Sequence, residues 1–157
     1  MTRPDGTTSE QLRLDRQLCF ALHAASRAFD AVYRPLLRDL GLTYPQYLVM
    51  LVLWEHGALT VKELGLTLRL DSGTLSPLLK RMEAANLVRR ERGKDDERSV
   101  TVHVTAAGAA LEEQALGVIE CIPEAIGMEE HEVLALHRSL GAVTTALDAA
   151  AERLNNQ

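Results

Sequence analysis

Three consecutive segments between residues 60 and 105 constrain the fold of this chain more than any other feature. Residues 60–63, Thr-Val-Lys-Glu, match a capping box, in which a threonine hydroxyl accepts the backbone N–H of the glutamate three residues later. A second helical pattern follows across residues 70–85, and two alternating stretches, residues 88–91 and 99–104, flank a charged turn. The sequence therefore predicts two short helices followed by a β-hairpin.

This order of elements is typical of a winged helix-turn-helix, whose second helix enters the major groove of DNA. Asp71 or Ser72 is the predicted cap of that second helix, and Asn86 closes it near residue 85. Pro77 falls inside the helix, where the missing N–H and a ring clash ordinarily cost about 3 kcal/mol. We therefore expect either a bend near Gly73 or a cap later than the one assigned.

The predicted DNA contacts are hydroxyl and basic side chains on this helix and on the hairpin. The small hydroxyls on the first turns suit contacts with bases or phosphates, and they belong to Ser72, Thr74 and Ser76. Further along the helix, Lys80 and Arg81 suit phosphates or guanine edges. At the hairpin tip, Arg98 suits a narrow minor groove, and Asp95 or Asp96 can brace its guanidinium.

The net charge of the chain is −5, which by itself disfavours a nucleic-acid partner. Between residues 80 and 98, however, seven basic residues outnumber five acidic ones, so this segment has a charge of +2 and the remainder −7. An acidic body with one basic edge can hold phosphates at that edge and orient the protein on a duplex. The alternative interpretation is an ordinary solvated hairpin.

Helical patterns also occupy both ends of the chain. Apolar residues recur every three or four positions from about residue 12 to Leu37, and a very apolar helix follows Thr43 or Tyr44, with Pro45 in its first turn. Two helices rich in alanine and leucine are expected at residues 106–122 and 129–154, divided by Pro123 and Gly127. With 46% apolar residues and few aromatics, the predicted fold class is mostly α with a small β wing.

This layout predicts four parts of the chain. They are a flexible N-terminus at residues 1–11, supporting and dimerising helices at 12–57, the DNA-binding region at 58–105 and C-terminal dimerisation helices at 106–154. A symmetric pair is expected because helix-turn-helix modules usually read two half-sites as a homodimer. The alternative is that the end helices fold back onto their own domain.

The sequence also restricts the compartment and the cofactors. The first residues are polar and lack the apolar core of a signal peptide, and the longest apolar run, residues 48–54, is too short to cross a bilayer. We expect a cytoplasmic protein with no membrane partner, whose two cysteines form no standing disulfide. The histidines and cysteines show no recognisable ligand spacing, so no metal or other cofactor is expected, although His131, Glu132 and His137 are near one another in sequence.

The residues described above resemble the MarR family of bacterial repressors. The resemblance rests on residues 59–64 (LTVKEL), 70–82 (LDSGTLSPLLKRM) and 95–99 (DDERS), and residues from about 14 to 150 follow the layout of that family. The chain is similar, more narrowly, to the organic hydroperoxide-sensing repressors, which have a cysteine near the start of the first helix and two tyrosines beyond it. The matching residues are Cys19, Tyr33 and Tyr44, and Cys121 resembles the second cysteine of the two-cysteine subgroup.

The resemblance implies a repressor that binds a pseudo-palindromic operator when reduced. An organic hydroperoxide would oxidise Cys19 to a sulfenic acid, and Cys121 of the partner subunit would attack it to form an intersubunit disulfide. Closing that bond would move helices and change the spacing of the two recognition helices. Arg16 and His23, at i−3 and i+4 from Cys19, favour the reactive thiolate, whereas Asp15 at i−4 opposes it.

Helix geometry adds a constraint on how the tyrosines reach the thiol. Cys19 and Tyr33 are fourteen positions apart, which is about 21 Å along one unbroken helix. A phenol that bonds the thiolate would therefore come from the partner subunit. The alternative is that the tyrosines are partly buried helix aromatics whose hydroxyls reach water, which is the favoured interpretation for Tyr47.

Other functions stay open at this point. Cys19 on an apolar helical stripe can be an inert core residue. A MarR-type repressor released by a reversibly bound phenolic or other small ligand would make both cysteines incidental. A thiol peroxidase is a more distant alternative, because the chain has no Cys-x-x-Cys pair and no βαβ pattern, so we do not expect an enzyme.

Overall fold

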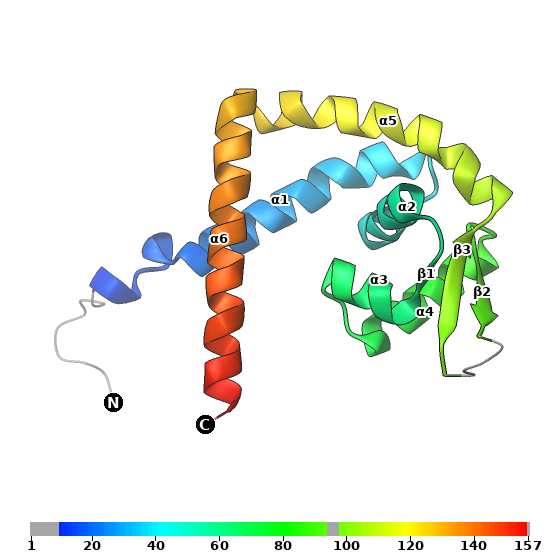
Figure 1. Ribbon diagram of the computed structural model, residues 1–157. Coiled ribbons are helices and arrows are strands. Elements are labelled where there is room, and N and C mark those ends of the chain that lie inside the picture. Colours follow the sequence, from blue (N-terminus) through cyan, green and yellow to red (C-terminus); the bar gives the residue numbers. More distant parts are fainter. Residues whose placement is uncertain (1–9, 94–97, 157) are drawn as a thin grey trace, which may run out of the picture. The chain divides into compact units, whose positions relative to one another are not determined.

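The computed structural model describes residues 10–93 and 98–156, which form two compact units. The first unit ends at Leu116 and the second begins at Gly117. The chain is mostly helical with one small antiparallel sheet, which confirms the predicted fold class (Figure 1). In chain order the elements are the 3-10 turns η1 (Glu10–Leu12) and η2 (Leu14–Arg16), then α1 (Leu18–Arg38), α2 (Tyr44–His56), β1 (Leu59–Thr60), α3 (Val61–Leu68), α4 (Ser72–Ala84), β2 (Val88–Arg92), β3 (Val100–Val104), α5 (Ala106–Ile126) and α6 (Glu130–Asn155).

The first long helix, α1, begins at Leu18, and the prediction of a start near residue 12 is wrong. Arg13 and Gln17 have extended backbone angles, with ψ of 134° and 113°, so two 3-10 turns precede the helix. The Gln17 side-chain amide donates to the backbone oxygens of Gln11 and Arg13 at 2.9 and 3.1 Å. The Gln17 amide thus occupies backbone oxygens that would accept from backbone N–H groups if the helix began earlier. The spacing of apolar residues does not show that a side chain competes for these oxygens.

Capping residues begin α2 and α3 where the sequence predicted. Thr43 is the cap of α2, its backbone N–H donates to Gln46 Oε1 at 2.9 Å, and Pro45 lies in the first turn. Thr60 is the cap of α3, where the Glu63 N–H donates to Thr60 Oγ1 at 3.2 Å and the Thr60 N–H donates to Glu63 Oε2 at 2.8 Å. Both capping boxes are complete, so local sequence is sufficient to start these helices.

The second helix of the pair, α4, continues through Pro77. Its N-cap is Asp71, one of the two predicted residues, and Asn86 follows the helix with a positive φ of 57°. The expectation of a later cap is therefore wrong. Pro77 has no N–H to donate to the backbone carbonyl of Gly73, four residues earlier. Gly73 lies in the first turn of α4, so the missing hydrogen bond affects the N-terminal end of the helix and leaves its middle intact.

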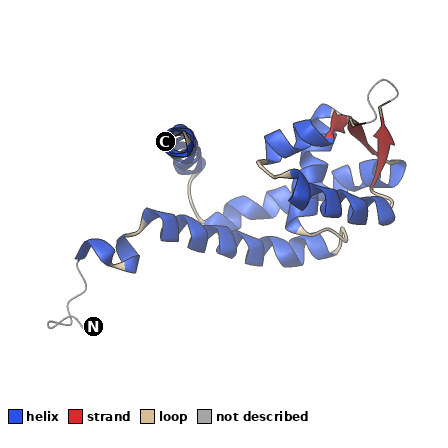
Figure 2. Cartoon of the chain, turned by 90° about the horizontal axis from the view of Figure 1, so that it is seen from below, coloured by secondary structure: helices blue, strands red, loops and turns tan. Residues whose placement is uncertain are grey.

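The sheet has three antiparallel strands in the order β1-β3-β2. The hairpin of β2 and β3 is confirmed, with Val88 opposite Val104. The third strand, β1, pairs Leu59 with Val102 and was not predicted, because two residues are too few to show an alternating pattern. It lies directly before α3 and thereby connects that helix to the wing, and Figure 2 shows the strands grouped together at one edge of the first unit.

A shared core joins α1, α2, α3, α4 and the sheet within the first unit. Each large apolar side chain enclosed in this way contributes roughly 1.5–3 kcal/mol to folding. The wing and the helix pair are therefore held in one frame. The fully enclosed side chains are Leu37, Tyr47, Val49, Met50, Leu53, Leu64, Leu75, Leu79, Met82, Val88 and Val102.

The start of α5 is in close contact with the backbone that follows α4. Thr105 Oγ1 donates to the backbone oxygen of Asn86 at 2.6 Å and accepts the Gly108 N–H at 3.0 Å. Trp54 Nε1 also donates to the Gly108 oxygen at 3.2 Å. A Cβ on Gly108 would overlap the backbone oxygen of Leu87, so this position requires glycine because two backbones approach each other here.

The second unit contains the end of α5 and the whole of α6. Pro123 lies inside α5, which continues to Ile126 and ends before Gly127, whose φ is 65°. The predicted end near Ile122 is wrong because the proline falls in the last turn, where one missing N–H interrupts little of the helix. Among the helices that the structure describes, none combines the length and apolar character needed to span a membrane.

Apolar side chains along α6 remain exposed when the chain is considered alone. No residue of α6 is buried, and Leu140 and Leu147 are 37% and 61% exposed. These side chains belong to a stripe with alternating spacings of three and four residues, the pattern of a helix that packs against another. We call this set the α6 stripe; it consists of Val133, Leu136, Leu140, Val143, Leu147, Ala150 and Leu154.

Candidate functional site

Helix α4 has one buried face and one polar face. Leu75, Leu78, Leu79 and Met82 are buried in the core of the first unit. The opposite face exposes the predicted hydroxyl and basic side chains: Ser72, Thr74, Ser76, Lys80 and Arg81. The structure therefore brings the predicted recognition residues together on one accessible surface.

Thr74 has a structural role in addition to its position on that surface. Its backbone N–H donates to Asp71 Oδ1 at 2.9 Å, and its hydroxyl donates to Asp71 Oδ2 at 3.0 Å. Hydrogen bonds from the Thr74 backbone and then from its side chain lower the pKa of Asp71, so the cap is charged at neutral pH. An Asp71 carboxylate beside the helix N-terminus also repels phosphate locally.

The wing hairpin closes with the Gly93 N–H donating to the Ser99 oxygen at 2.8 Å. Arg98 is exposed next to the start of β3. Asp95 and Asp96, the residues predicted to brace Arg98, lie outside the described residues.

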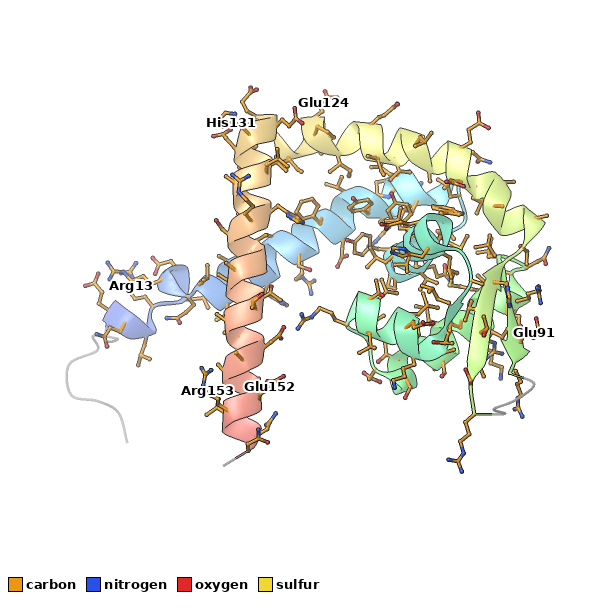
Figure 3. All side chains as sticks on the ribbon, viewed as in Figure 1. Arg13, Glu91, Glu124, His131, Glu152 and Arg153 are labelled. Atoms are coloured by element: carbon orange, nitrogen blue, oxygen red, sulfur yellow. The ribbon has the colours of Figure 1, made fainter. Side chains whose placement is uncertain are left out.

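Two of the arginines counted as basic charge in the wing form intramolecular ion pairs. Arg90 donates to Glu83 Oε2 through Nε at 3.0 Å and Nη2 at 2.8 Å, and its backbone N–H donates to Glu83 Oε1 at 2.8 Å. These bonds lower the pKa of Glu83 and attach β2 to the end of α4. Arg89 pairs with Glu91 at 2.8 Å on the outer side of the wing, where Figure 3 labels Glu91. Arg89 and Arg90 are therefore less available to phosphates than the sequence count implied.

A hollow of about 660 Å³ separates α3, α4 and the wing. Lys62 and Leu66 of α3 were not among the predicted site residues, and Leu66 is 72% exposed despite its apolar side chain. Their spacing of four residues places both on the same side of α3, which is the only signal that could have indicated them. The residues that line the hollow include Thr60, Lys62, Leu66, Ser76, Arg90 and Arg98.

Cys19 is a free, exposed thiol in the first turn of α1. Exposure excludes the inert core interpretation for the chain taken by itself. Arg16 was expected to lie on the same helix as Cys19 and to favour its thiolate. This prediction is wrong, because Arg16 lies on a 3-10 turn before the helix and pairs with Glu10 at 3.0 Å. Asp15 is likewise paired, with Arg13 at 2.7 Å, on the N-terminal turns where Figure 3 labels Arg13.

Three tyrosines form a cluster between α1 and α2. The ring centroid of Tyr33 lies 4.7 Å from that of Tyr44 and 5.8 Å from that of Tyr47. The rings of Tyr33 and Tyr44 are half-buried, whereas Tyr47 is 1% exposed. The interpretation that the Tyr47 hydroxyl reaches water is therefore wrong. The first turns of α2 pack against α1 and enclose the Tyr47 ring.

Helix α1 is continuous from Cys19 to Tyr33, as expected from the sequence. The two residues are about 21 Å apart along the axis at 1.5 Å per residue. Within one chain, therefore, the tyrosine cluster cannot contact the Cys19 sulfur.

Cys121 is also a free, exposed thiol, in the part of α5 that belongs to the second unit. Its sulfur donates to the Gly117 backbone oxygen at 3.3 Å, which is ordinary helical back-bonding. Neither cysteine is paired within the chain. Across residues 10–93 and 98–156, no group of three or more histidine, cysteine and carboxylate side chains is arranged to hold a metal ion.

The helix pair, its sheet and the hairpin of β2 and β3 define a winged helix-turn-helix protein. A family model described as transcriptional regulator SarA/Rot matches residues 31–114. The organic hydroperoxide resistance transcriptional regulator of Bacillus subtilis (strain 168) is 52% identical over 109 residues, which cover 69% of this chain and 74% of the relative.

Solved structures show the same fold. Reduced AbfR bound to DNA has a TM-score of 0.76 and 34% identity, covering 90% of this chain and 99% of that one, and AbfR comes from Staphylococcus epidermidis. Disulfide-formed AbfR has a TM-score of 0.63 and 36% identity, covering 86% and 95%. A mutant of MarR from E. coli complexed with operator DNA has a TM-score of 0.76 and 26% identity, covering 86% and 99%. The chain belongs to the SarA/Rot and MarR-type family of winged-helix transcriptional regulators.

Proposed function

We propose that this protein is a homodimeric repressor that binds a pseudo-palindromic operator when reduced and releases it after an organic hydroperoxide oxidises Cys19. The observation on which the sensing part depends is the free, exposed thiol of Cys19 at the start of α1, on a chain 52% identical to an organic hydroperoxide resistance regulator. The relatives are regulators of transcription, which favours binding over enzymatic turnover.

The polar face of α4 and Arg98 of the wing form the proposed DNA surface. Ser72 and Ser76 contact bases or phosphates, Lys80 and Arg81 contact phosphates or guanine edges, and Arg98 enters the minor groove. Thr74 is shared between this surface and the helix cap. Two relatives with the same fold, AbfR and MarR, have been solved with DNA, which supports this assignment.

Replacing Arg98 with alanine is expected to weaken operator binding by about tenfold or more, because a minor-groove arginine contributes both charge and shape recognition. Lys80→Ala is expected to weaken binding more uniformly across sequences and to reduce the slope of log K against log salt by about one. Fluorescence anisotropy at several salt concentrations measures both effects, using a duplex that the reduced protein selects from a random library. Arg13→Ala, which removes an exposed cation on the N-terminal turns, is the matched control and should leave affinity unchanged. Equal losses in the control would contradict the assignment of these contacts.

The proposed chemistry begins at the Cys19 thiolate. The sulfur attacks one oxygen of the hydroperoxide, an S–O bond forms as the O–O bond breaks, and the departing alkoxide takes up a proton to leave as an alcohol. Sulfur loses two electrons and the peroxide gains them. The thiolate of Cys121 of the partner subunit then attacks the sulfenic acid sulfur, so that the S–S bond forms as the S–O bond breaks, and the hydroxide that leaves takes up a proton to become water.

Intersubunit geometry follows from the length of α1. A phenol that bonds the thiolate belongs to the partner subunit, since Cys19 and Tyr33 of one chain are about 21 Å apart. A disulfide needs Cα atoms about 4.4–6.8 Å apart, so closing the bond restrains the relative position of the two subunits. The two recognition helices must match half-sites at a fixed spacing, and this restraint would prevent the match. The existence of a disulfide-formed structure of AbfR supports this type of switch.

The test compares wild type with Cys19→Ser and Cys121→Ser after treatment with cumene hydroperoxide. Wild-type protein is expected to lose most of its operator binding and to recover it in dithiothreitol, while Cys19→Ser keeps its affinity. On a non-reducing gel, a covalent dimer should form in wild type and in neither variant. Equal loss of binding by Cys19→Ser would overturn the sensing proposal and leave the DNA proposal standing. Release that dilution reverses and dithiothreitol does not would instead indicate a reversibly bound ligand.

A further inference from the structure

The hydroxyl of Tyr47 is buried and has no hydrogen-bond partner among the residues that the structure describes. The residue is 1% exposed, and its ring is part of the core between α1 and α2. Buried hydroxyls are nearly always hydrogen-bonded, because an unpaired one loses its contacts with water and gains nothing in return. Packing alone does not explain this oxygen, since a phenylalanine would fill the same volume without it.

The ring of Tyr47 lies beside that of Tyr33, whose ring in turn lies beside that of Tyr44. The Tyr47 and Tyr33 ring centroids lie 5.8 Å apart, with the ring planes inclined by 40°, and Tyr44 lies 4.7 Å from Tyr33. Burial, and then the charges that Tyr33 and Tyr44 would have if ionised, raise the pKa of Tyr47 to about 12. Tyr47 therefore keeps its proton and remains a donor at any physiological pH.

We propose that Tyr47 is a positioning residue of the hydroperoxide-sensing site, whose hydroxyl donates a hydrogen bond to the phenol oxygen of Tyr33 when Tyr33 turns toward the reacting thiolate. The inference rests on the proposed function. A phenol that accepts a hydrogen bond becomes a stronger donor itself, because hydrogen-bond chains polarise one another. Tyr33 would then stabilise the thiolate of Cys19 of the partner subunit, or the departing alkoxide, more strongly, and Tyr47 would act through Tyr33 without touching either.

The experiment measures the rate of sulfenic acid formation at Cys19 with cumene hydroperoxide, trapped with dimedone, in a Cys121→Ser parent that stops the reaction at this stage. Tyr47→Phe is expected to slow the reaction by about three- to tenfold, the range of one hydrogen bond. Its melting temperature is expected to equal or exceed that of the parent, because the change removes an unpaired buried hydroxyl. Operator affinity of the reduced protein should not change.

A double-mutant cycle separates positioning from ordinary packing. If Tyr47 acts through the Tyr33 oxygen, then Tyr47→Phe should cause no further slowing in a Tyr33→Phe background. Phe29→Leu is the matched control, since the Phe29 ring lies 6.4 Å from Tyr33 and offers no hydroxyl, and it should change the rate by less than about twofold.

Three results would overturn the inference. An unchanged rate in Tyr47→Phe, additive slowing in the double variant, or equal slowing in Phe29→Leu would each assign Tyr47 to packing alone and leave the proposed function intact. A parent protein whose Cys19 is not oxidised by hydroperoxide would overturn the proposed function, and this inference with it.

Discussion

Replacing Leu140 and Leu147 with glutamate is expected to convert the proposed dimer into a monomer. Both side chains belong to the α6 stripe, no residue of α6 is buried in the single chain, and a helix with such an apolar stripe needs a partner surface. If the variant still formed the dimer, both glutamates of each subunit would be buried without a charged partner. The desolvation of these charges would cost more free energy than burial of the apolar stripe gains on association. The monomer would hold one half-site, and loss of the linked second site should reduce operator affinity by about 10²- to 10⁴-fold.

Light scattering coupled to size-exclusion chromatography measures the mass, and anisotropy on the selected duplex measures the affinity. Thr145→Glu is the matched control, because this exposed residue lies outside the α6 stripe on the same helix. The control should remain dimeric with unchanged affinity. If the double glutamate variant is still a dimer, then the subunits associate through another surface, and the assignment of the α6 stripe to the dimer interface is wrong.

Replacing Gly108 with alanine is expected to lower the free energy of unfolding by about 3 kcal/mol or more, and the melting temperature by roughly 10 °C. The added Cβ would overlap the Leu87 backbone oxygen, and it would also lie 3.0 Å from Val104 Cγ1. The neighbour is backbone, so no side chain can rotate to make room. The start of α5 would have to move, which would disturb the hydrogen bonds of Thr105 and Trp54 at the same junction.

Thermal and urea denaturation followed by circular dichroism measure this loss. Gly117→Ala in the same helix is the matched control, since a Cβ there has no atom within 4 Å. It should be neutral or stabilise the protein by up to about 1 kcal/mol, because alanine is the better helix former. Similar losses in both variants would show that helix propensity, and not the overlap with Leu87, determines the effect at Gly108.

Structural roles that depend on neighbouring residues in the sequence could be predicted. The caps at Thr43, Thr60 and Asp71 lie where expected, and so does the hairpin of β2 and β3. Each depends on bonds or alternation within a few residues. The start of α1 was misplaced because apolar periodicity does not show the Gln17 side-chain amide that bonds the preceding carbonyls. The end of α5 was misplaced because Pro123 was taken as a boundary, although the helix continues past it to Ile126.

The distribution of charge was only partly predictable. The count of bases in residues 80–98 included Arg90, but its guanidinium is bound to Glu83, seven positions earlier in the chain. Composition cannot distinguish a basic residue that is available to a phosphate from one that joins two elements. The same limit applies to Thr74, which the sequence placed on the recognition surface without indicating its bond to Asp71.

The helix pair, the wing and the polar face of α4 follow from local sequence, because caps, turns and amphipathic spacing are local properties of a chain. Long-range packing determines that β1 joins the sheet, that Gly108 meets the backbone at Leu87, and that the Tyr47 hydroxyl is buried with its ring beside Tyr33. Burial and close approach depend on which distant segments pack together. No pattern confined to neighbouring residues contains that information.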